Sequence, residues 1–269
     1  MKETIQIITA EVRKMHKNQY HSYSVYITLL IWPFLILFNT YYTYFSFNIS
    51  ILNRYSIYNK NDLMIFLVIG SLGLNIFFSM VQSSWQMSSE RQDGTLEVIF
   101  YSPANRLTIL YGRAISTVFE NVWIFLVFLV YLLFLSENID FLLIFKSFLS
   151  FIVLFISAVV WGVFLNSIFL FTRDASFLFN LMDSPMDFFS GVRFPTVAFP
   201  FVLRGISYIY PLTYCLNVFR KIFNSGESTF DTVQLVYLTM ILVIMHIIAK
   251  LITKSADKKF REKDSFNFY

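Results

Sequence analysis

The chain has 269 residues, of which 57% are hydrophobic and only 14% are charged, and its mean hydropathy is +0.61. Soluble domains carry about 25% charged residues, because their surface needs polar cover, so a water-soluble globular fold is excluded. The excess apolar surface must meet lipid. The net charge of +4 does not indicate a nucleic-acid partner, because the basic residues lie between long apolar runs and not along one face. They are better explained as charges that orient membrane spans.

The first 24 residues are polar and charged. They contain no apolar core and no small-residue cleavage site, so we expect no removable signal peptide. Ile5, Ile8, Val12 and Met15 recur at helical spacing among basic residues. This pattern predicts an amphipathic helix within residues 1–24, which either lies at the cytoplasmic membrane surface or packs on a partner as a connector.

Apolar runs long enough to cross a bilayer need roughly 20 residues. The chain has six such runs, although the fifth is short, and they predict an all-α membrane protein. The expected spans are residues 25–46, 63–82, 114–135, 141–170, 175–190 and 232–251. Because Lys and Arg gather on the cytoplasmic side, we place both termini inside, which puts about two thirds of the 21 Lys and Arg residues there. The tail, 252–269, is then a basic cytoplasmic segment.

Residues 191–231 would then lie outside, although they carry four basic residues. Proline removes a backbone donor and breaks a lipid-facing helix, and this segment contains three prolines. We therefore expect short re-entrant or interfacial helices on the outer side instead of a further span. The basic residues there could also meet an anionic lipid or polymer; they are Arg193, Arg204, Arg220 and Lys221. One membrane domain over 1–269 is the simplest organisation.

The longest cytoplasmic connection, 83–114, is the segment most informative about function. We expect a short amphipathic helix at its centre. Thr95 can cap that helix, because its hydroxyl accepts a hydrogen bond from a free amide of the first turn, and Pro103 ends it. An apolar face beside charged residues suits contact with a cytoplasmic protein.

Two motifs resemble those of ABC-2 type transporter permeases. The first reads Glu90-Arg91-x-x-Gly94-Thr95-Leu96-Glu97, then Ser102-Pro103 and the pair Gly112-Arg113. The second reads Ser190-Gly191-x-x-Phe194-Pro195, Phe199-Pro200 and Tyr210-Pro211-Leu212-Thr213-Tyr214. The six spans and the cytoplasmic connection after the second span also match, so the resemblance covers nearly the whole chain.

This resemblance implies a mechanism and partners. Two permease subunits, identical or different, pack together in the lipid bilayer above two cytoplasmic ABC ATPase subunits. Closure of the ATPases on nucleotide switches the permease pair between inward-open and outward-open states, and the helix after the second span couples the two motions. Carried over residue by residue, the ATPase-coupling residues are Glu90, Arg91, Gly94, Thr95, Leu96, Glu97, Ser102 and Pro103. The alternative is that Glu90 and Glu97 merely solvate a loop.

The chain has no ATP-binding motif of its own. A phosphate cradle needs Gly-x-x-x-x-Gly-Lys-Ser/Thr, and none of the eight glycines precedes a lysine. We therefore expect no enzyme activity and no cofactor or metal on this chain, with ATP and Mg²⁺ bound by the partner ATPase. His246 lies in an apolar run, where a hydrogen-bonded structural role is expected.

Polar residues inside spans are candidates for a translocation path, because burying charge in lipid is costly. The candidates are Asn75, Glu120, Asp183 and Asp187. The alternative pairs the aspartates with nearby cations, for example Asp187 with Arg193 or Arg204. Asn75 shares its helix face with Gly70 and Gly73, a small-residue pattern that favours close helix packing.

Together these observations predict a multi-pass exporter permease in a bacterial cytoplasmic membrane, with a hydrophobic or amphipathic cargo such as a drug, an antimicrobial peptide, a lipid or a lipid-linked glycan. Two other classes stay open. An ion-gradient-driven secondary transporter would move cargo without an ATPase. A non-transporting membrane immunity or anchor protein would protect cells without cargo-stimulated ATP hydrolysis.

Overall fold

The structure is a computed structural model that describes residues 2–19, 23–44, 57–92, 94, 101–102, 104–136, 140–170, 180, 184–224 and 232–262. Its regular structure within these ranges is helical, which confirms the all-α expectation. In chain order the helices are α1 (Lys2–Gln19), α2 (Tyr23–Tyr44), α3 (Lys60–Gln92), α5 (Arg106–Ser116), α6 (Val118–Leu135), α7 (Phe141–Phe169), the 3₁₀ turn η2 (Thr196–Ala198), α9 (Phe201–Ser207), α10 (Pro211–Asn224) and α11 (Thr232–Glu262).

Five candidate membrane spans lie within the described residues. They are Tyr23–Thr43, Lys60–Gln82, Arg106–Leu135, Phe141–Phe169 and Thr232–Lys258. These correspond to the first, second, third, fourth and sixth expected spans. The expected fifth span, 175–190, falls largely outside the described residues, which show helix only at 180 and 184–189. Six spans and cytoplasmic termini therefore stay predictions.

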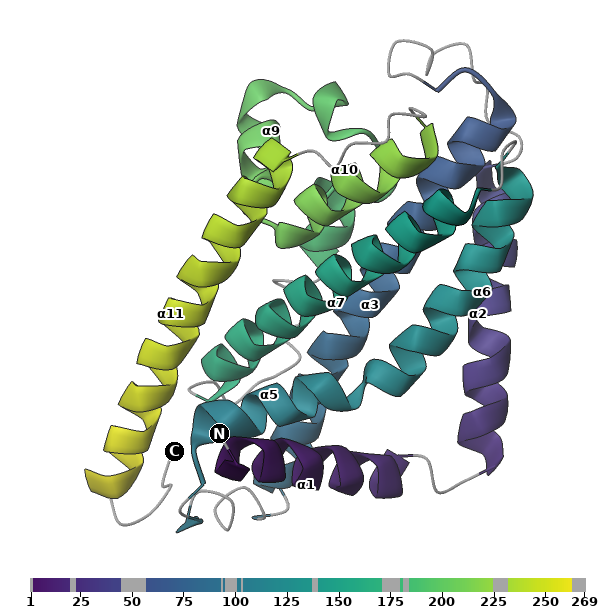
Figure 1. Ribbon diagram of the computed structural model, residues 1–269. Helices are drawn as coiled ribbons and strands as arrows, with labels where there is room; N and C mark the ends of the chain where they lie inside the picture. Colours follow the sequence, from purple (N-terminus) through teal and green to yellow (C-terminus); the bar gives the residue numbers. More distant parts are fainter. Residues whose placement is uncertain are drawn as a thin grey trace.

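Helix α3 is the centre of the bundle (Figure 1), and α2, α6, α7 and α10 all pack on it. The short helices α9 and α10 lie at one end of the bundle, and α1 and α5 lie at the other. The end of α11 reaches the α1–α5 end, where Glu3 of α1 and Lys254 of α11 line one cavity. The first and last described helices therefore meet at the same end of the molecule.

Small residues let the helices approach α3 closely. A Cβ atom on Gly73 would lie 2.7 Å from Leu216 Cδ2 of α10, and one on Gly162 of α7 would lie 2.8 Å from Met80 Cβ. Helices in lipid associate through van der Waals packing, because lipid removes the hydrophobic driving force between them, and small residues increase that packing. The close packing expected on the Gly70–Gly73 face is present in the structure.

The connection after the second span is shorter than expected at both ends. Helix α3 continues past residue 82 to Gln92, because the polar residues that follow the apolar run contain no helix breaker before Gly94. Gly94 has φ +70°, a conformation that glycine adopts without steric cost and that commonly follows a helix end. At the other end, α5 begins at Arg106, where the Asn105 side chain caps it by accepting a hydrogen bond from the Leu107 amide at 3.0 Å. Hydropathy alone missed both polar helix extensions.

The amphipathic helix expected at the N-terminus is present as α1, and it packs on α5 of its own chain. Met15 is buried, Ile8 and Val12 are half-buried, and Ile5 is exposed. The apolar stripe therefore serves an intramolecular contact along most of its length.

The segment between the fifth and sixth expected spans forms η2, α9 and α10, as short helices and not one long one. Arg220 of α10 anchors this segment. Its guanidinium is buried, stacks on the Phe66 ring with 3.4 Å to the centroid, and donates to the carbonyl oxygens of Phe66 at 3.0 Å and Val192 at 3.2 Å. Gly70 leaves room for this contact, because a Cβ there would lie only 2.3 Å from the Val192 oxygen.

Candidate functional site: a buried ion network and a polar groove

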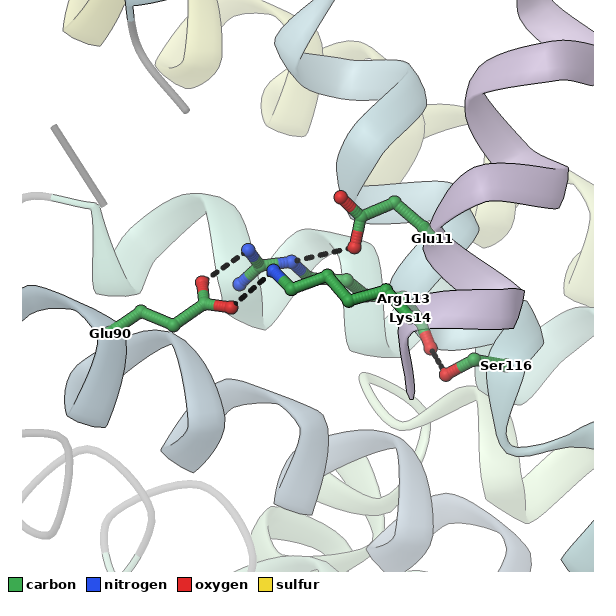
Figure 2. A network of polar contacts seen from close by, with 5 residues as sticks. All are labelled: Glu11, Lys14, Glu90, Arg113 and Ser116. Carbon is green, nitrogen blue, oxygen red and sulfur yellow. Dashed lines mark hydrogen bonds and ion pairs between the residues drawn. The ribbon is translucent and has the colours of Figure 1, made fainter. Parts of the chain in front are cut away.

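A network of charged residues joins three helices at the α1–α5 end of the bundle (Figure 2). Glu90 comes from the last turns of α3, Glu11 and Lys14 from α1, and Arg113 from α5. The Glu90 carboxylate accepts from Arg113 Nη2 through one oxygen and from Lys14 Nζ at 2.6 Å through the other. Lys14 and Arg113, from two other segments of the chain, thus both bind the Glu90 carboxylate.

The burial of Arg113 makes this network more than a surface contact. Its side chain is 2% exposed, and its Nε lies 3.6 Å from a Glu11 oxygen, so two carboxylates face one buried guanidinium. A buried charge without a partner is strongly unfavourable, because it has lost its hydration. The pair Gly112-Arg113 therefore has a structural basis: Arg113 needs the acids of α1 and α3 beside it.

Gly112 allows that approach. A Cβ on Gly112 would lie 2.9 Å from Glu11 Cβ and 3.3 Å from Ile8 Cα, so α1 and α5 touch at this glycine. The missing side chain brings Glu11 within reach of Arg113. The Gly-Arg pair of the motif thus sets both the spacing and the charge of the α1–α5 contact.

A bend follows directly after this network. Helix α5 ends at Ser116 and α6 begins at Val118, with Thr117 between them. The Thr117 hydroxyl lies 2.9 Å from the Ala114 oxygen and 3.3 Å from Met80 Sδ of α3, and Asn121 accepts from Ser79 of α3 at 3.0 Å. The bend is therefore fixed to α3, and α6 leaves it into the bundle (Figure 1).

The structure places some of the expected ATPase-coupling residues and not others. Glu90 does not solvate a loop; it lies in the ion network. The Ser102 carbonyl oxygen accepts from Arg106 Nη1 at 2.8 Å, which ties the end of the connection to α5. Gly94 is exposed, with no atom within 4 Å of a Cβ built on it. Outside the described residues or side chains lie Arg91, Thr95, Leu96, Glu97 and Pro103, and with them the expected coupling helix.

The second feature lies at the opposite end of α3 from Glu90, the end that the expected topology places outside. We call it the outer groove: it is the cavity of about 460 Å³ between α2, α3 and the segment 187–193. Polar side chains from both helices line it, and so do apolar ones. The lining residues are Trp32, Leu35, Ile36, Asn39, Thr40, Thr43, Leu67, Ser71, Leu74, Asn75, Asp187, Val192 and Arg193.

Two of the expected path residues, Asn75 and Asp187, meet in this groove. Asn75 donates to the Ser71 carbonyl oxygen at 2.7 Å, and Ser71 lies 3.2 Å from the Thr40 hydroxyl of α2. Asp187 accepts from Arg193 Nη2 at 2.7 Å and Nε at 3.2 Å. The groove therefore combines a path-like polar lining with the ion pair that the alternative interpretation of Asp187 expected.

The other expected path residues are elsewhere. Glu120 lies in the first turn of α6, beside the bend, and does not line the outer groove. Asp183 lies outside the described residues. His246 of α11 forms a hydrogen bond of 2.6 Å with the Tyr111 hydroxyl of α5, which agrees with a structural histidine.

Several residues of both features were missed by sequence reasoning. Glu11 and Lys14 lie in the predicted amphipathic helix, and nothing in that pattern indicates their partners. Lys14 pairs with Glu90, 76 residues further along the chain, and Glu11 faces Arg113. Asn39, Thr40 and Thr43 carried a signal, because polar residues at i, i+1 and i+4 in an apolar span share one helix face. That signal could have placed the groove on α2.

The comparison with protein families agrees with this architecture. A family model described as ABC-2 type transporter matches residues 6–224, which is most of the chain. A comparison with curated proteins gave no match. The chain belongs to the ABC-2 type transporter family, and it is a multi-pass, non-catalytic membrane permease domain of that family.

Proposed function

We propose that this chain is the transmembrane subunit of an ATP-driven exporter in a bacterial cytoplasmic membrane. Family membership supports a partner ATPase. In the proposed complex two ATPase subunits hold ATP and Mg²⁺ beneath a pair of permease chains, identical or different. The α1–α5 end of the bundle faces the cytoplasm, and cargo moves outward.

The ion pair between Glu90 and Arg113 carries the coupling part of this proposal. Glu90 is the first residue of the motif whose remainder would contact the ATPase. Because its carboxylate also binds Lys14 of α1, a displacement of the motif moves α1 and α5 together. Helix α5 continues through the bend at Thr117 into α6, so the same displacement reaches the bundle as a rigid-body motion.

The cargo is hydrophobic or amphipathic. Helices α2 and α11 support this, because only 17% of each spanning window is buried within the chain. Their apolar faces meet lipid or the second permease subunit. The polar groups of the outer groove lie next to one of these faces, which suits a molecule with both kinds of surface.

Gly94 offers the sharpest test of coupling. Its φ of +70° is strained for any other residue, yet a side chain there would touch no described atom. Gly94→Pro should therefore change the direction of the motif without disturbing the packed bundle. In proteoliposomes with the ATPase that co-purifies with the chain, we expect ATP hydrolysis to persist while transport is lost.

Gly205→Ala is the matched control, because Gly205 lies in α9 and a Cβ there also meets no atom within 4 Å. It should transport normally. Normal transport by Gly94→Pro would contradict the proposed joint.

The two alternative classes predict different results in the same assay. A secondary transporter would move cargo in proteoliposomes that hold an ion gradient and no ATPase. A non-transporting immunity or anchor protein would protect cells while no ATPase preparation showed cargo-stimulated hydrolysis. The ion pair of Asp187 with Arg193 counts against the secondary transporter, because it engages one of the ionisable groups on which gradient coupling would depend.

A further inference from the structure

The polar atoms of the outer groove are incompletely used within the chain. Asn39 accepts a hydrogen bond from the Thr43 hydroxyl at 3.0 Å, and Asn75 donates to the Ser71 carbonyl oxygen. In the part of the chain that the structure describes, the Asn39 Nδ2 and Asn75 Oδ1 atoms have no hydrogen-bond partner. One donor and one acceptor, on facing helices, thus remain available to a ligand in the groove.

The charge of the groove is balanced. Asp187 and Arg193 are the two charged residues that line it, and they pair with each other. The other arginines of this end are also engaged: Arg204 donates to the carbonyl oxygens of Val197 and Phe199, and Arg220 is buried. An anionic headgroup would therefore find no unpaired cation among the residues that line the groove.

The groove opens toward the exposed face of α2. Trp32 and Leu35 line it and are about half exposed, at 47% and 54%. A molecule that places a polar group between Asn39 and Asn75 can keep an apolar chain along Trp32 and Leu35. The apolar chain then stays in the hydrocarbon region of the bilayer, so binding does not require it to leave the lipid.

We propose that the outer groove binds the headgroup of an amphiphile with no net charge, either zwitterionic or uncharged, that carries both hydrogen-bond donors and acceptors. If the bound amphiphile is a cargo, this proposal rests on the exporter function proposed above. If it is a resident lipid, the proposal is independent of that function. The same chemistry is offered by a resident phospholipid and by a single-chain amphiphilic cargo.

Photolabelling of the full chain in nanodiscs tests this. One probe is a dodecyl phosphoethanolamine, whose ammonium donates and whose phosphate accepts hydrogen bonds, with a diazirine at the first carbons of its chain, and the comparison probe is the corresponding dodecyl sulfate. Mass spectrometry then locates the label. We expect the phosphoethanolamine probe, and not the sulfate, to label the α2 and α3 peptides that contain Trp32 and Asn75.

Matched variants identify the groove as the labelled place. Asn39→Leu removes the free donor and should reduce labelling about fivefold, the change expected from one hydrogen bond. Thr43→Val removes the hydrogen bond that orients the Asn39 amide and should also reduce labelling. Thr28→Val is the control, because Thr28 is an exposed threonine of the same helix that binds only the Ser24 carbonyl oxygen and does not line the groove. It should label like the unmodified chain. Equal labelling by the sulfate probe, unchanged labelling of both groove variants, or no label on α2 and α3 would overturn the proposal.

The lipid of the nanodisc distinguishes the two sources. If the groove holds a resident phospholipid, discs that contain phosphatidylethanolamine should suppress labelling and phosphatidylglycerol discs should permit it. If it selects single-chain amphiphiles, labelling should be equal in both. Either result supports the proposal. The labelling assay contains no ATPase, so it can fail independently of the exporter function. Absent labelling with intact stimulation of the ATPase would refute the groove and leave the exporter function standing. Labelling of the groove without any stimulation of an ATPase would refute the exporter function and leave the groove standing.

Discussion

The buried guanidinium of Arg113 forms an ion pair with the carboxylate of Glu90, although the two residues belong to helices on either side of the connection between α3 and α5. This ion pair holds the two ends of that connection together. A partner protein that contacts the connection therefore acts on α3 and α5 as a pair.

Removing the Glu90 charge should destabilise the fold. Breaking a buried pair by removing one partner costs about 3–5 kcal/mol, and Glu11 at 3.6 Å from Arg113 should keep the loss for Glu90→Gln toward the lower end. We expect a lower melting temperature in detergent, measured by fluorescence-detected gel filtration. The double variant Glu90→Gln, Arg113→Gln should lose less than the sum of the single variants, because the buried guanidinium that Glu90→Gln leaves without Glu90 is then absent as well. Additive losses would show that the two residues act independently.

A side chain at Gly112 should separate α1 from α5. Gly112→Ala places a Cβ 2.9 Å from Glu11 Cβ, and overpacking of this kind costs about 1–3 kcal/mol. A cysteine introduced at Met15, which is buried, should then react faster with a maleimide. The same cysteine in a Gly205→Ala background should stay protected. Equal protection in both backgrounds would mean that α1 tolerates the added methyl group. Cys215 is buried and can be replaced by serine to give a thiol-free starting chain.

Arg220 should hold the outer short helices in place. Arg220→Leu removes two hydrogen bonds to carbonyl oxygens, each worth about 1.5–3 kcal/mol because the donor is charged. We expect faster cleavage by trypsin at Arg193 and Arg204 in detergent, followed by peptide mapping. Lys221→Leu is the control, because Lys221 is exposed on the same helix. Unchanged cleavage of the Arg220→Leu chain would show that apolar packing alone holds the segment.

The hydrogen bond between Tyr111 and His246 should stabilise the contact of α5 with α11. Tyr111→Phe removes only the hydroxyl and should cost about 1 kcal/mol, seen as a small decrease in melting temperature. Tyr42→Phe, at an exposed position of α2, should have no effect. A second loss when His246→Phe is added to Tyr111→Phe would indicate that His246 has a further partner.

The positions of the five candidate spans within the described residues were predictable, because each depends on the length of one apolar run. The helix ends were not, since residues 83–92 are polar and continue α3 only for want of a breaker, and Asn105 starts α5 by a local cap. The ion network depends on pairs such as Lys14 with Glu90, which are 76 residues apart, and no spacing rule reaches that far. Asn75 and Asp187 were each predicted as polar exceptions, but their meeting depends on how the segment 187–193 packs on α3.

The buried position of Arg220 has a consequence for the biogenesis of this protein. The ribosome produces Phe66 and Val192 before Arg220, so the acceptors of the guanidinium already exist when the cation emerges. The cation itself can settle only after both have come together around Gly70. A chain that terminates before Arg220 therefore lacks the guanidinium that joins the segment at Val192 to α3 at Phe66.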